Sequence, residues 1–297
     1  MAADDISSAD LTQATAEFVA VRGRLFGIAY RMLGSRTEAE DIVQEVWLRW
    51  QRYDRSSVIE PAAFLATTTT RLCINALQSA RARRETYIGP WIPEPVDTSA
   101  DPVLGAERGE ALELATLMLL ERLSPTERAA YVLREAFDYP YAQIGDVLQI
   151  QEGNARQLVT RARRHIAAER RAPVDSAQQK RLLEALVAAA EQGDLQRLER
   201  LLAEDVVSYT DGNGMRGAAR VAVHGRQTVA KFLRAFAPNF WPGTAVSFVE
   251  ANGAPCVLVS RNGTVVALLA MSVSIDGIDR LMWVLSPDKL GGFTHLQ

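Results

Sequence analysis

Six polar side chains that suit DNA recognition recur between positions 156 and 164. They are Arg156, Gln157, Thr160, Arg161, Arg163 and Arg164. At about 100° per residue, all six fall on one side of a helix, and the apolar residues of the segment fall on the other. Guanidinium groups form paired hydrogen bonds to guanine edges and also bind phosphates, so this face is suited to duplex DNA. A solvated helix end, rich in arginine because cations favour a helix C-terminus, is the alternative interpretation.

Two short helices joined by a turn are predicted to position this basic face. A helix over residues 141–148 is followed by a turn over 149–154, and we expect the basic helix to begin at Ala155. That spacing is typical of a helix-turn-helix, whose second helix enters the major groove. Just upstream, Ser124-Pro-Thr-Glu127 is predicted to cap a further helix that runs through Glu135.

The distribution of charge limits what the basic helix does alone. The chain has 297 residues, enough for two or three domains, and a net charge of −3. Positive charge is local, because residues 156–171 hold six arginines and one acid, Glu169. An acidic protein with one basic strip binds free DNA weakly. We therefore expect a subunit that reads DNA within a larger assembly.

Two helices are predicted near the start of the chain, and the second carries a polar stripe. The first spans residues 11–33, and the second begins after Ser35, which with Glu38 forms a capping box. The stripe, opposite the apolar face of the second helix, contains Asp41, Gln44 and Glu45. Periodicity alone predicts nothing more than a solvated face for it.

A third helix is predicted to start near Pro61 and to end in a basic cluster. The polar residues of interest on it are Arg71, Asn75, Arg81, Arg83 and Arg84. Four consecutive threonines occupy positions 67–70. Their hydroxyls either contact a phosphate backbone or bond back to the helix, and periodicity does not separate the two interpretations.

Residues 87–109 contain four prolines and no periodicity, which predicts a linker or an extended segment. Its motif Trp91-Ile-Pro-Glu-Pro95 is unusual for a spacer, because a large aromatic side chain between prolines is costly to leave in water. We therefore expect Trp91 to dock against a folded surface.

The chain changes character after a proline-containing break at residues 172–176. An amphipathic helix ending at Gly193, a short helix reaching Ala203 and a helix over 226–236 precede strand-like runs separated by Asn-Gly and Asp-Gly turns. This order predicts an α+β domain whose sheet curls over its helices. From Ser176 onward there are 12 basic and 11 acidic residues, so we do not expect this domain to bind nucleic acid.

The cysteine spacing and the hydropathy indicate a reduced, cytosolic protein. Cys73 and Cys256 lie in different predicted domains and have no metal-ligand spacing, so we expect neither a disulfide nor a metal site. The acidic N-terminus lacks the apolar segment of a signal peptide, and the longest apolar run, 265–271, is too short to span a membrane. Nothing in the sequence predicts a cofactor.

Two motifs resemble a known family. The segment FVAVRGRLFGIAYRMLGSRTEAEDIVQEVWLRW resembles region 2 of extracytoplasmic-function (ECF, group 4) sigma factors, of the sigma-70 family. LSPTERAAYVLREAFDYPYAQIGDVL, followed by NARQLVTRARR, resembles their region 4. The remainder resembles the SnoaL-like (NTF2-like) extension of one sub-group, whose WLPEP, DGGG and NPDKL motifs read here WIPEP (91–95), DGNGM (211–215) and SPDKL (286–290).

The resemblance implies a multidomain architecture with two all-α sigma domains and a C-terminal α+β cone. Region 2, a helical bundle, would span 11–87, the linker 88–109, the region 4 helix-turn-helix 110–172, and the SnoaL-like domain 176–297. The implied function is promoter-specific initiation of transcription. The implied partners are core RNA polymerase, through its clamp helices and flap, and promoter DNA, with no membrane.

The resemblance also implies roles for individual residues. The stripe of Asp41, Gln44 and Glu45 would dock on the clamp helices, and the polar residues of the third helix, from Arg71 to Arg84, would read and open the −10 element. All six residues of the basic helix would contact the −35 element, with Arg163 and Arg164 on phosphates. Contacts that regulate activity in cis are expected from Trp91, Pro93, Asp211, Asp288 and Lys289.

Two alternatives of other classes stay open. SnoaL-like domains form a cone-shaped pocket that can hold a small-molecule ligand, and some relatives perform acid–base chemistry. The residues available for that chemistry are Asp211, His224 and Asp276, which form no paired set in the sequence, so we do not expect an enzyme. The other alternative is a one-component helix-turn-helix regulator with a ligand-binding or enzymatic NTF2-like domain, which would bind DNA without polymerase.

Overall fold

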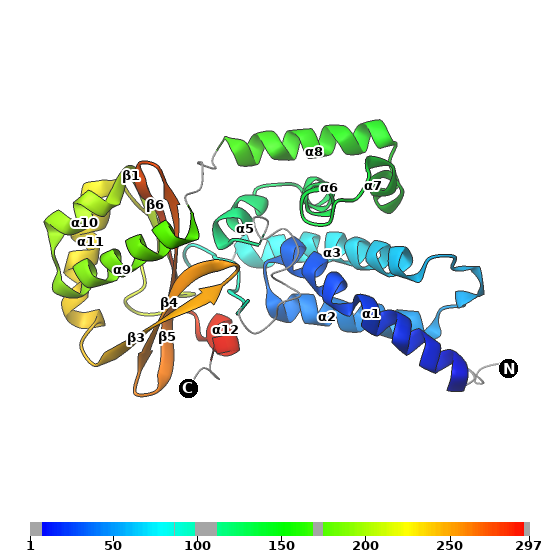
Figure 1. Cartoon of the computed structure of the whole chain (residues 1–297), viewed down its shortest axis with the longest axis horizontal. Helices are drawn as coiled ribbons and strands as arrows, with labels where there is room; N and C mark the ends of the chain where they lie inside the picture. Colours follow the sequence, from blue (N-terminus) through cyan, green and yellow to red (C-terminus); the bar gives the residue numbers. More distant parts are fainter. Residues whose placement is uncertain (1–7, 86, 99–111, 169–174, 294–297) are drawn as a thin grey trace. The chain divides into compact units, whose positions relative to one another are not determined.

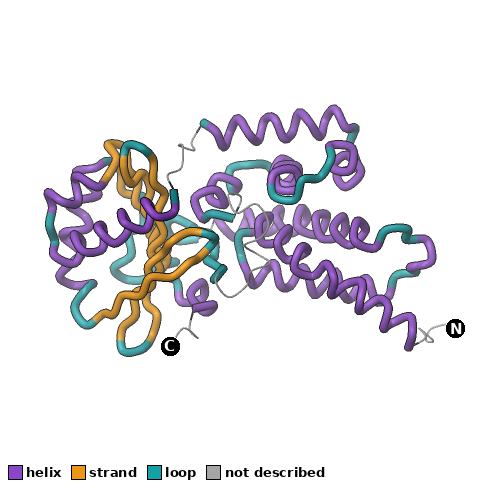
Figure 2. The backbone as a smooth tube through the Cα atoms, viewed as in Figure 1, coloured by secondary structure: helices purple, strands orange, loops and turns teal. Residues whose placement is uncertain are grey.

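A computed structural model describes residues 8–85, 87–98, 112–168 and 175–293 (Figure 1). By its internal contacts the chain divides into two compact units. The first comprises Met1–Arg81, Ala106–Ala111 and Leu120–His165, and the second comprises Ala82–Gly105, Leu112–Leu119 and Ile166–Gln297. The first is helical and the second combines helices with a sheet (Figure 2).

The N-terminal part of the first unit is a helical bundle. Its helices are α1 (Ser8–Leu33), α2 (Arg36–Arg52) and α3 (Pro61–Glu85), with a short 3-10 turn, η1 (Arg55–Ser57), between α2 and α3. Gly34 ends α1 in the left-handed region, with φ of 67°, and Ser35 caps α2 by accepting a hydrogen bond from the backbone N–H of Glu38. The fully buried Trp50 of α2 donates its indole N–H to the Ala14 carbonyl at 3.2 Å, which fixes α2 against α1.

The remainder of the first unit contains the predicted helix-turn-helix. α6 (Pro125–Glu135) begins with a complete Ser124/Glu127 capping box, and α7 (Tyr141–Leu148) leads through a turn into α8 (Glu152–Ala167). Gly145 of α7 is required there, because a Cβ atom at this position would lie 2.7 Å from the carbonyl oxygen of Ile150.

The basic helix begins earlier than predicted. α8 starts at Glu152 rather than at Ala155. The backbone N–H groups of Asn154 and Ala155 both donate to the Gln151 carbonyl, at 2.9 and 3.1 Å. The helical hydrogen-bonding pattern thus begins within residues that look like a turn in the sequence.

The second unit is built on a six-stranded sheet of order β2-β1-β6-β5-β4-β3. Its strands are β1 (Leu202–Asp211), β2 (Val223–His224), β3 (Thr244–Ala251), β4 (Ala254–Arg261), β5 (Thr264–Ser274) and β6 (Gly277–Val284). The helices α9 (Ser176–Gln192), α10 (Leu195–Leu201) and α11 (Arg226–Phe240) pack on one face of the sheet. The other elements are α5 (Leu114–Leu120), of which Leu120 belongs to the first unit, α12 (Pro287–Leu290) and η3 (Gly291–Phe293).

The predicted meander is confirmed for β3 to β6, whose neighbours pair antiparallel. Asn252-Gly253 and Asn262-Gly263 have positive φ at both residues, as two-residue hairpin turns require. Two features differ from the prediction: the short helix ends at Leu201, and α11 continues through Pro238 to Phe240. The parallel pairing of β1 with β6 was not predicted.

Aromatic packing accounts for the longer α11. Phe240 lies 5.6 Å from Trp283 of β6 and 4.9 Å from Trp241, ring centroid to ring centroid. These contacts hold the last turn of the helix on the sheet, and they outweigh the loss of one hydrogen bond at Pro238. The elements of both units are those of the predicted fold class. In the described part of the chain, no helix has both the length and the apolar character needed to cross a membrane.

Candidate nucleic-acid interface and linker docking site

The outer face of α8 presents all the predicted polar residues to solvent. Arg156, Gln157, Thr160, Arg161, Arg163 and Arg164 are exposed. The inner face is buried, with Ala155, Val159 and Ala162 completely inaccessible. The hydroxyl of Thr160 donates to the carbonyl of Arg156 at 2.8 Å, so this side chain is turned back onto its own helix.

Three of the α8 arginines are paired with nearby carboxylates. Arg156 lies 3.0 Å from Glu152 of the same helix, measured nitrogen to oxygen. Arg161 and Arg163 reach back to α6, 3.4 Å from Glu127 and 2.8 Å from Glu135. Exposed pairs of this kind contribute about 0–1 kcal/mol each, so they orient the guanidinium groups and can exchange for phosphate contacts.

Arg71 of α3 caps the helix that precedes the turn. Its Nε donates to the Val147 carbonyl at 2.9 Å and its Nη2 donates to the Asp146 carbonyl at 3.1 Å. The last carbonyls of α7 have no partner within their own helix, and a cation there also complements the helix dipole. In this structure Arg71 is therefore engaged with the helix-turn-helix.

The other residues predicted to contact the −10 element also lie on α3. Asn75 is exposed. Arg81, Arg83 and Arg84 are in the last two turns of the helix, but their side chains lie outside the described part of the structure. The threonine hydroxyls of positions 68–70 donate to carbonyls four residues earlier, at 2.8–2.9 Å. Of the two interpretations of the threonine run, back-bonding is the one that these three residues follow.

Buried arginines inside the first unit were not predicted. Arg128 of α6 is 3% exposed, donates to the Met32 carbonyl at 2.6 Å and pairs with Glu121 at 2.7 Å. Burial lowers the pKa of Arg128 to about 9. Arg31 of α1 is completely buried, and its guanidinium group lies over the ring of Phe137, 5.2 Å from the centroid. The sequence signal available was weak, since arginines inside an otherwise amphipathic pattern usually lie at the surface.

The polar stripe of α2 lies where the periodicity placed it. Asp41 and Gln44 are exposed and Glu45 is half-buried, whereas Val43 and Val46 are buried. Glu45 accepts a hydrogen bond from Nε of Arg49 at 2.7 Å. The stripe is accessible within the first unit, and none of its residues supports the fold by burial.

The linker segment 87–98 docks on the second unit. Ile92, Pro93, Glu94, Pro95 and Val96 are all buried, so the segment is not a free spacer. The C-terminal end of the segment lies along the β3–β4 turn, where Val96 and Asn252 form two hydrogen bonds, at 2.9 and 3.0 Å. Asn252 also donates its side-chain amide to the Leu112 carbonyl at 2.9 Å. One hairpin residue thus ties two parts of the chain to the sheet.

Asp211, at the end of β1, binds the N-terminal part of the docked linker segment. It is completely buried and accepts hydrogen bonds from the Tyr87 hydroxyl at 2.5 Å, the Ile92 backbone N–H at 2.7 Å and Nζ of Lys289 at 2.7 Å. Its carbonyl accepts from the backbone N–H groups of Leu285 and Ser286. Three motifs that are distant in the sequence therefore meet at one carboxylate.

Lys289 completes this cluster, which we call the Asp211 knot (Tyr87, Trp91, Ile92, Asp211 and Lys289). Its ammonium group donates to the Ile92 carbonyl at 2.5 Å and lies over the Trp91 ring, 4.3 Å from the centroid. Burial, followed by the hydrogen bond to Asp211 and its charge, raises the pKa of Tyr87 above its usual range.

Of the five residues expected to regulate, the structure gathers Trp91, Asp211 and Lys289. Pro93 is buried in the docked linker next to this cluster, and Asp288 is exposed on α12. Tyr87 and Ile92 were missed. Ile92 contacts Asp211 through its backbone N–H, which does not depend on the residue type and so cannot be predicted from it. The tyrosine four residues before Trp91 is the one sequence feature that pointed to this contact.

The structure does not bring the three candidate acid–base residues together. His224 is exposed and pairs with Val207, four residues from Asp211 along β1, or roughly 13 Å at strand rise. Asp276 lies in the β5–β6 turn, eight residues before Val284, which is the residue of β6 that pairs with Asp211. At strand rise this places Asp276 roughly 25 Å from that pair. Among the described residues, no group of three His, Cys, Asp or Glu side chains is placed to hold a metal ion.

The cone between α11 and the sheet is filled by aromatic side chains. The remaining cavity has a volume of about 20 Å³ and is lined by apolar residues that include Phe236, Phe240, Trp241 and Trp283. Buried Nε1 of Trp283 has no hydrogen-bond partner among the described residues. The free volume is enough for about one water molecule.

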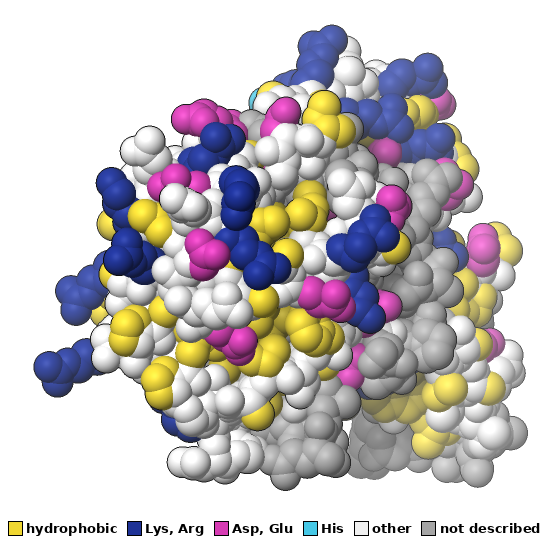
Figure 3. Space-filling view, turned by 60° about the vertical axis from the view of Figure 1, so that its left-hand side comes forward, with side chains coloured by type: hydrophobic (Ala, Val, Ile, Leu, Met, Phe, Trp, Pro, Cys, Tyr) yellow, Lys and Arg dark blue, Asp and Glu magenta, His cyan; other side chains and the backbone are white. Residues whose placement is uncertain are grey.

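Charges on the second unit are mixed. Figure 3 shows basic and acidic side chains interspersed over the visible face, with apolar side chains between them. No continuous basic strip runs across that face, in contrast to the outer face of α8. That the C-terminal domain does not bind nucleic acid stays a prediction.

Comparison with known proteins gives matches along most of the chain. The sequence model of Sigma-70 region 2 matches residues 18–83, and that of Sigma-70, region 4 matches residues 113–166. The ECF RNA polymerase sigma factor SigJ of Mycobacterium tuberculosis is 39% identical over 291 residues, which cover 93% of each chain. A probable ECF RNA polymerase sigma factor of the same organism, SigI, is 32% identical over 282 residues, covering 93% of this chain and 94% of the relative. The crystal structure of SigJ superposes with a TM-score of 0.76 and 32% identity, covering 94% of this chain and 98% of that one.

Proposed function

Because the chain belongs to the ECF RNA polymerase sigma factors, we propose that it binds core RNA polymerase and directs initiation at promoters with −35 and −10 elements. The observation that carries the proposal is α8, a helix buried on one face and lined with exposed arginines on the other, after a tight turn. In this proposal Arg156, Gln157 and Arg161 read bases, and Arg163 and Arg164 contact phosphates. The family acts by binding rather than by catalysis, and we infer a cytoplasmic site of action.

Two surfaces of the first unit support the remaining contacts. The accessible stripe of Asp41, Gln44 and Glu45 is proposed to bind the polymerase clamp helices. Asn75 and the arginines of α3 are proposed to capture bases of the melted −10 element, where Watson–Crick edges are exposed. Arg71 must release the carbonyls of α7 to take part, so we expect DNA binding to compete with this contact.

Initiation with purified core polymerase tests this proposal. The chain is added to core polymerase on a promoter library, and transcripts are mapped. We expect initiation at sites that share −35 and −10 elements, and little DNA binding without core. Specific DNA binding by the chain alone, with no initiation, would instead support the one-component regulator.

We further propose that the C-terminal domain regulates initiation in cis through the Asp211 knot. The docked linker joins region 2 to region 4, so its length and path set how far these two domains can separate. The knot fixes that path by the contacts of a single buried carboxylate. Release of the linker would shift the equilibrium between two arrangements of regions 2 and 4. The shift is limited to the difference between the free energies with which the linker docks in each arrangement.

Substitution of Lys289 tests regulation in cis without shortening the chain. Lys289→Met keeps an unbranched side chain one atom shorter and removes the charge, and Lys231→Met, at an exposed position on α11, is the matched control. We expect Lys289→Met, and not Lys231→Met, to change the initiation rate with core polymerase. Equal rates for both variants and the unmodified protein would reject regulation through the knot.

Any ligand of the cone would have the indole N–H of Trp283 as its buried donor.

A further inference from the structure

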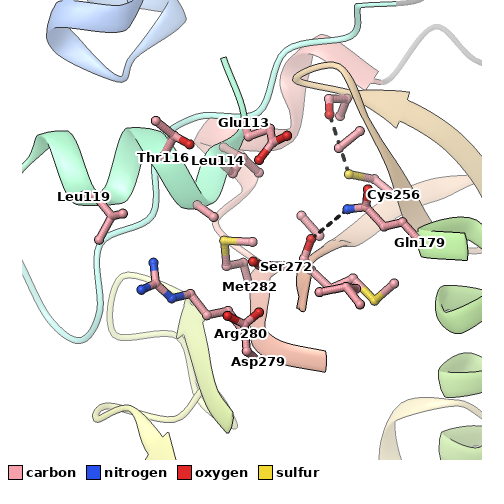
Figure 4. Close-up of a pocket in the computed structure, with 16 residues that line it drawn as sticks. Glu113, Leu114, Thr116, Leu119, Gln179, Cys256, Ser272, Asp279, Arg280 and Met282 are labelled. Carbon is pink, nitrogen blue, oxygen red and sulfur yellow. Dashed lines mark hydrogen bonds between the residues drawn. The ribbon is translucent and has the colours of Figure 1, made fainter. Parts of the chain in front are cut away.

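A second cavity of the C-terminal unit lies away from the aromatic cone. It has a volume of about 50 Å³, room for about three or four water molecules. On one side it is lined by α5 and the residues just before it, Glu113 to Leu119. On the other side it is lined by residues of β4, β5 and β6, including Cys256, Ala270 and Met282 (Figure 4). These three belong to the face of the sheet turned away from the core that packs on α9 and α11.

A β-bulge places two successive charged residues of β6 on this cavity. The pairing of β5 with β6 steps from Ser272↔Arg280 to Val273↔Ile278, which leaves Asp279 as the extra residue. In a regular strand Asp279 and Arg280 would point to opposite faces, but the bulge turns both toward the cavity. Bulges commonly re-aim side chains in this way at functional sites.

One oxygen of the Asp279 carboxylate has no hydrogen-bond partner in the described part of the chain. Asp279 is 7% exposed, and its Oδ1 is buried without a hydrogen bond among the described residues. A buried charged oxygen left in this state is costly, so a native fold normally supplies a donor to it. The donor is therefore expected from a molecule in the cavity.

The other lining groups restrict the chemistry of that molecule. Two nearby donors are already used, since the Gln179 amide donates to the Met271 carbonyl at 3.1 Å and the Cys256 thiol donates to the Ala251 carbonyl at 3.8 Å. Burial raises the pKa of Cys256 to about 12, so the thiol stays neutral and adds no charge. The charged lining residues are two acids, Glu113 and Asp279, and one base, Arg280.

We propose that this cavity binds a small organic cation, with a primary ammonium group on Asp279 and a short hydrocarbon portion against Ala270 and Met282. The ammonium supplies both the missing donor and a charge opposite to the net charge of the lining. The volume limits the ligand to a few non-hydrogen atoms. A water cluster of the same size would satisfy the oxygen but would show no preference for charge.

Methyl NMR on the full chain tests the site. The six methionines are labelled at the methyl carbon, and ethylammonium chloride is titrated into the protein at constant ionic strength. Met271 and Met282 line the cavity, and Met32, buried in the first unit, is the internal reference. We expect saturable shifts of the two cavity methyls and none of Met32. Ethanol, which has the same size without the charge, should bind at least tenfold more weakly.

Two variants and a matched control keep the test decisive. Asp279→Asn should weaken ethylammonium binding at least tenfold, whereas Asp276→Asn, which removes an equal charge from the exposed β5–β6 turn, should not. Ala270→Leu fills the cavity without touching the carboxylate and should also abolish binding. No saturable shift, ethanol binding as tight as ethylammonium, or unchanged binding in Asp279→Asn and Ala270→Leu would each overturn the proposal. The circular dichroism spectrum of each ligand-free variant reports whether the second unit is folded, which the Met32 signal of the first unit does not.

Discussion

Replacing Asp211 with asparagine should release the linker while the rest of the second unit stays folded. Asparagine has the same shape, so no cavity is created. One oxygen can still accept from the N–H of Ile92 and from Lys289. The amide nitrogen then faces the Tyr87 hydroxyl, which must rotate to accept instead of donating. The change therefore removes the charge of the knot and keeps its packing.

The expected cost follows from the contacts that lose their charge. Removing one partner of a buried ion pair costs about 3–5 kcal/mol. The side chain of Lys289 is 12% exposed and keeps its hydrogen bond to the Ile92 carbonyl and its contact with Trp91, so we take the lower end, about 3 kcal/mol. At 1.4 kcal/mol per factor of ten, docking should weaken by roughly a hundredfold.

Amide hydrogen exchange measures this cost directly. The N–H of Ile92 donates to Asp211, so its exchange reports opening of the linker. We expect its protection to fall by roughly a hundredfold in Asp211→Asn, with little change at Leu269 in the middle of β5. Asp205→Asn, at an exposed position of the same strand, is the matched control.

A double variant separates the knot from a general loss of stability. Lys289→Met removes the opposite charge, so Asp211→Asn combined with Lys289→Met should cost less than the sum of the two single changes. If the Ile92 amide of Asp211→Asn exchanges within about twofold of the unmodified protein, the charge of the knot contributes nothing to docking. If Leu269 loses protection equally, the unit unfolds as a whole and the linker is not a separate element.

Three further predictions concern the interfaces and the pH dependence. Replacing Asp41 and Glu45 with lysine should abolish capture of core polymerase, while the free energy of unfolding changes by about 1 kcal/mol or less because both lie on the solvent side of α2; unchanged capture would remove this surface from the interface. Arg156→Ala should cost about 1–3 kcal/mol at one or two base pairs of the −35 element, whereas Arg164→Ala should weaken all sequences equally and reduce the salt dependence. Equal loss at every sequence for Arg156→Ala would make it a phosphate contact. Because the pKa of Tyr87 is raised in the folded protein, its contribution to stability is complete below about pH 10 and is lost as the pH rises further. Absorbance titration at alkaline pH should therefore show a late-titrating tyrosine that Tyr87→Phe removes.

Features set by neighbouring residues could be read from the sequence. The capping box at Ser124, the two faces of α8 and the Asn-Gly turns at 252–253 and 262–263 each depend on side chains within a few positions. Each such motif satisfies local backbone groups or separates polar from apolar side chains. These features could be predicted because the interactions that stabilise them join residues that are close in the sequence.

Features set by distant pairing could not be read in this way. Asp211 meets Ile92 and Tyr87 across 119 and 124 positions, and nothing in the spacing of these residues fixes which partner each will find. The parallel pairing of β1 with β6 and the bulge at Asp279 depend on how strands align after the chain has folded. The partners of Arg161 and Arg163 on α6 were missed for the same reason.

The position of α5 limits how freely the parts of this chain could be exchanged. The match to region 4 begins at residue 113, yet by its contacts the segment Leu112–Leu119 belongs to the second unit. Leu114 is almost completely buried and lines the cavity on the sheet of that unit, and the Leu112 carbonyl accepts a hydrogen bond from Asn252. A recombination event that grafted a different extension onto residue 172 would bring no surface matched to these leucines. The extension and the first helix of region 4 are therefore expected to be inherited together, as one unit of descent.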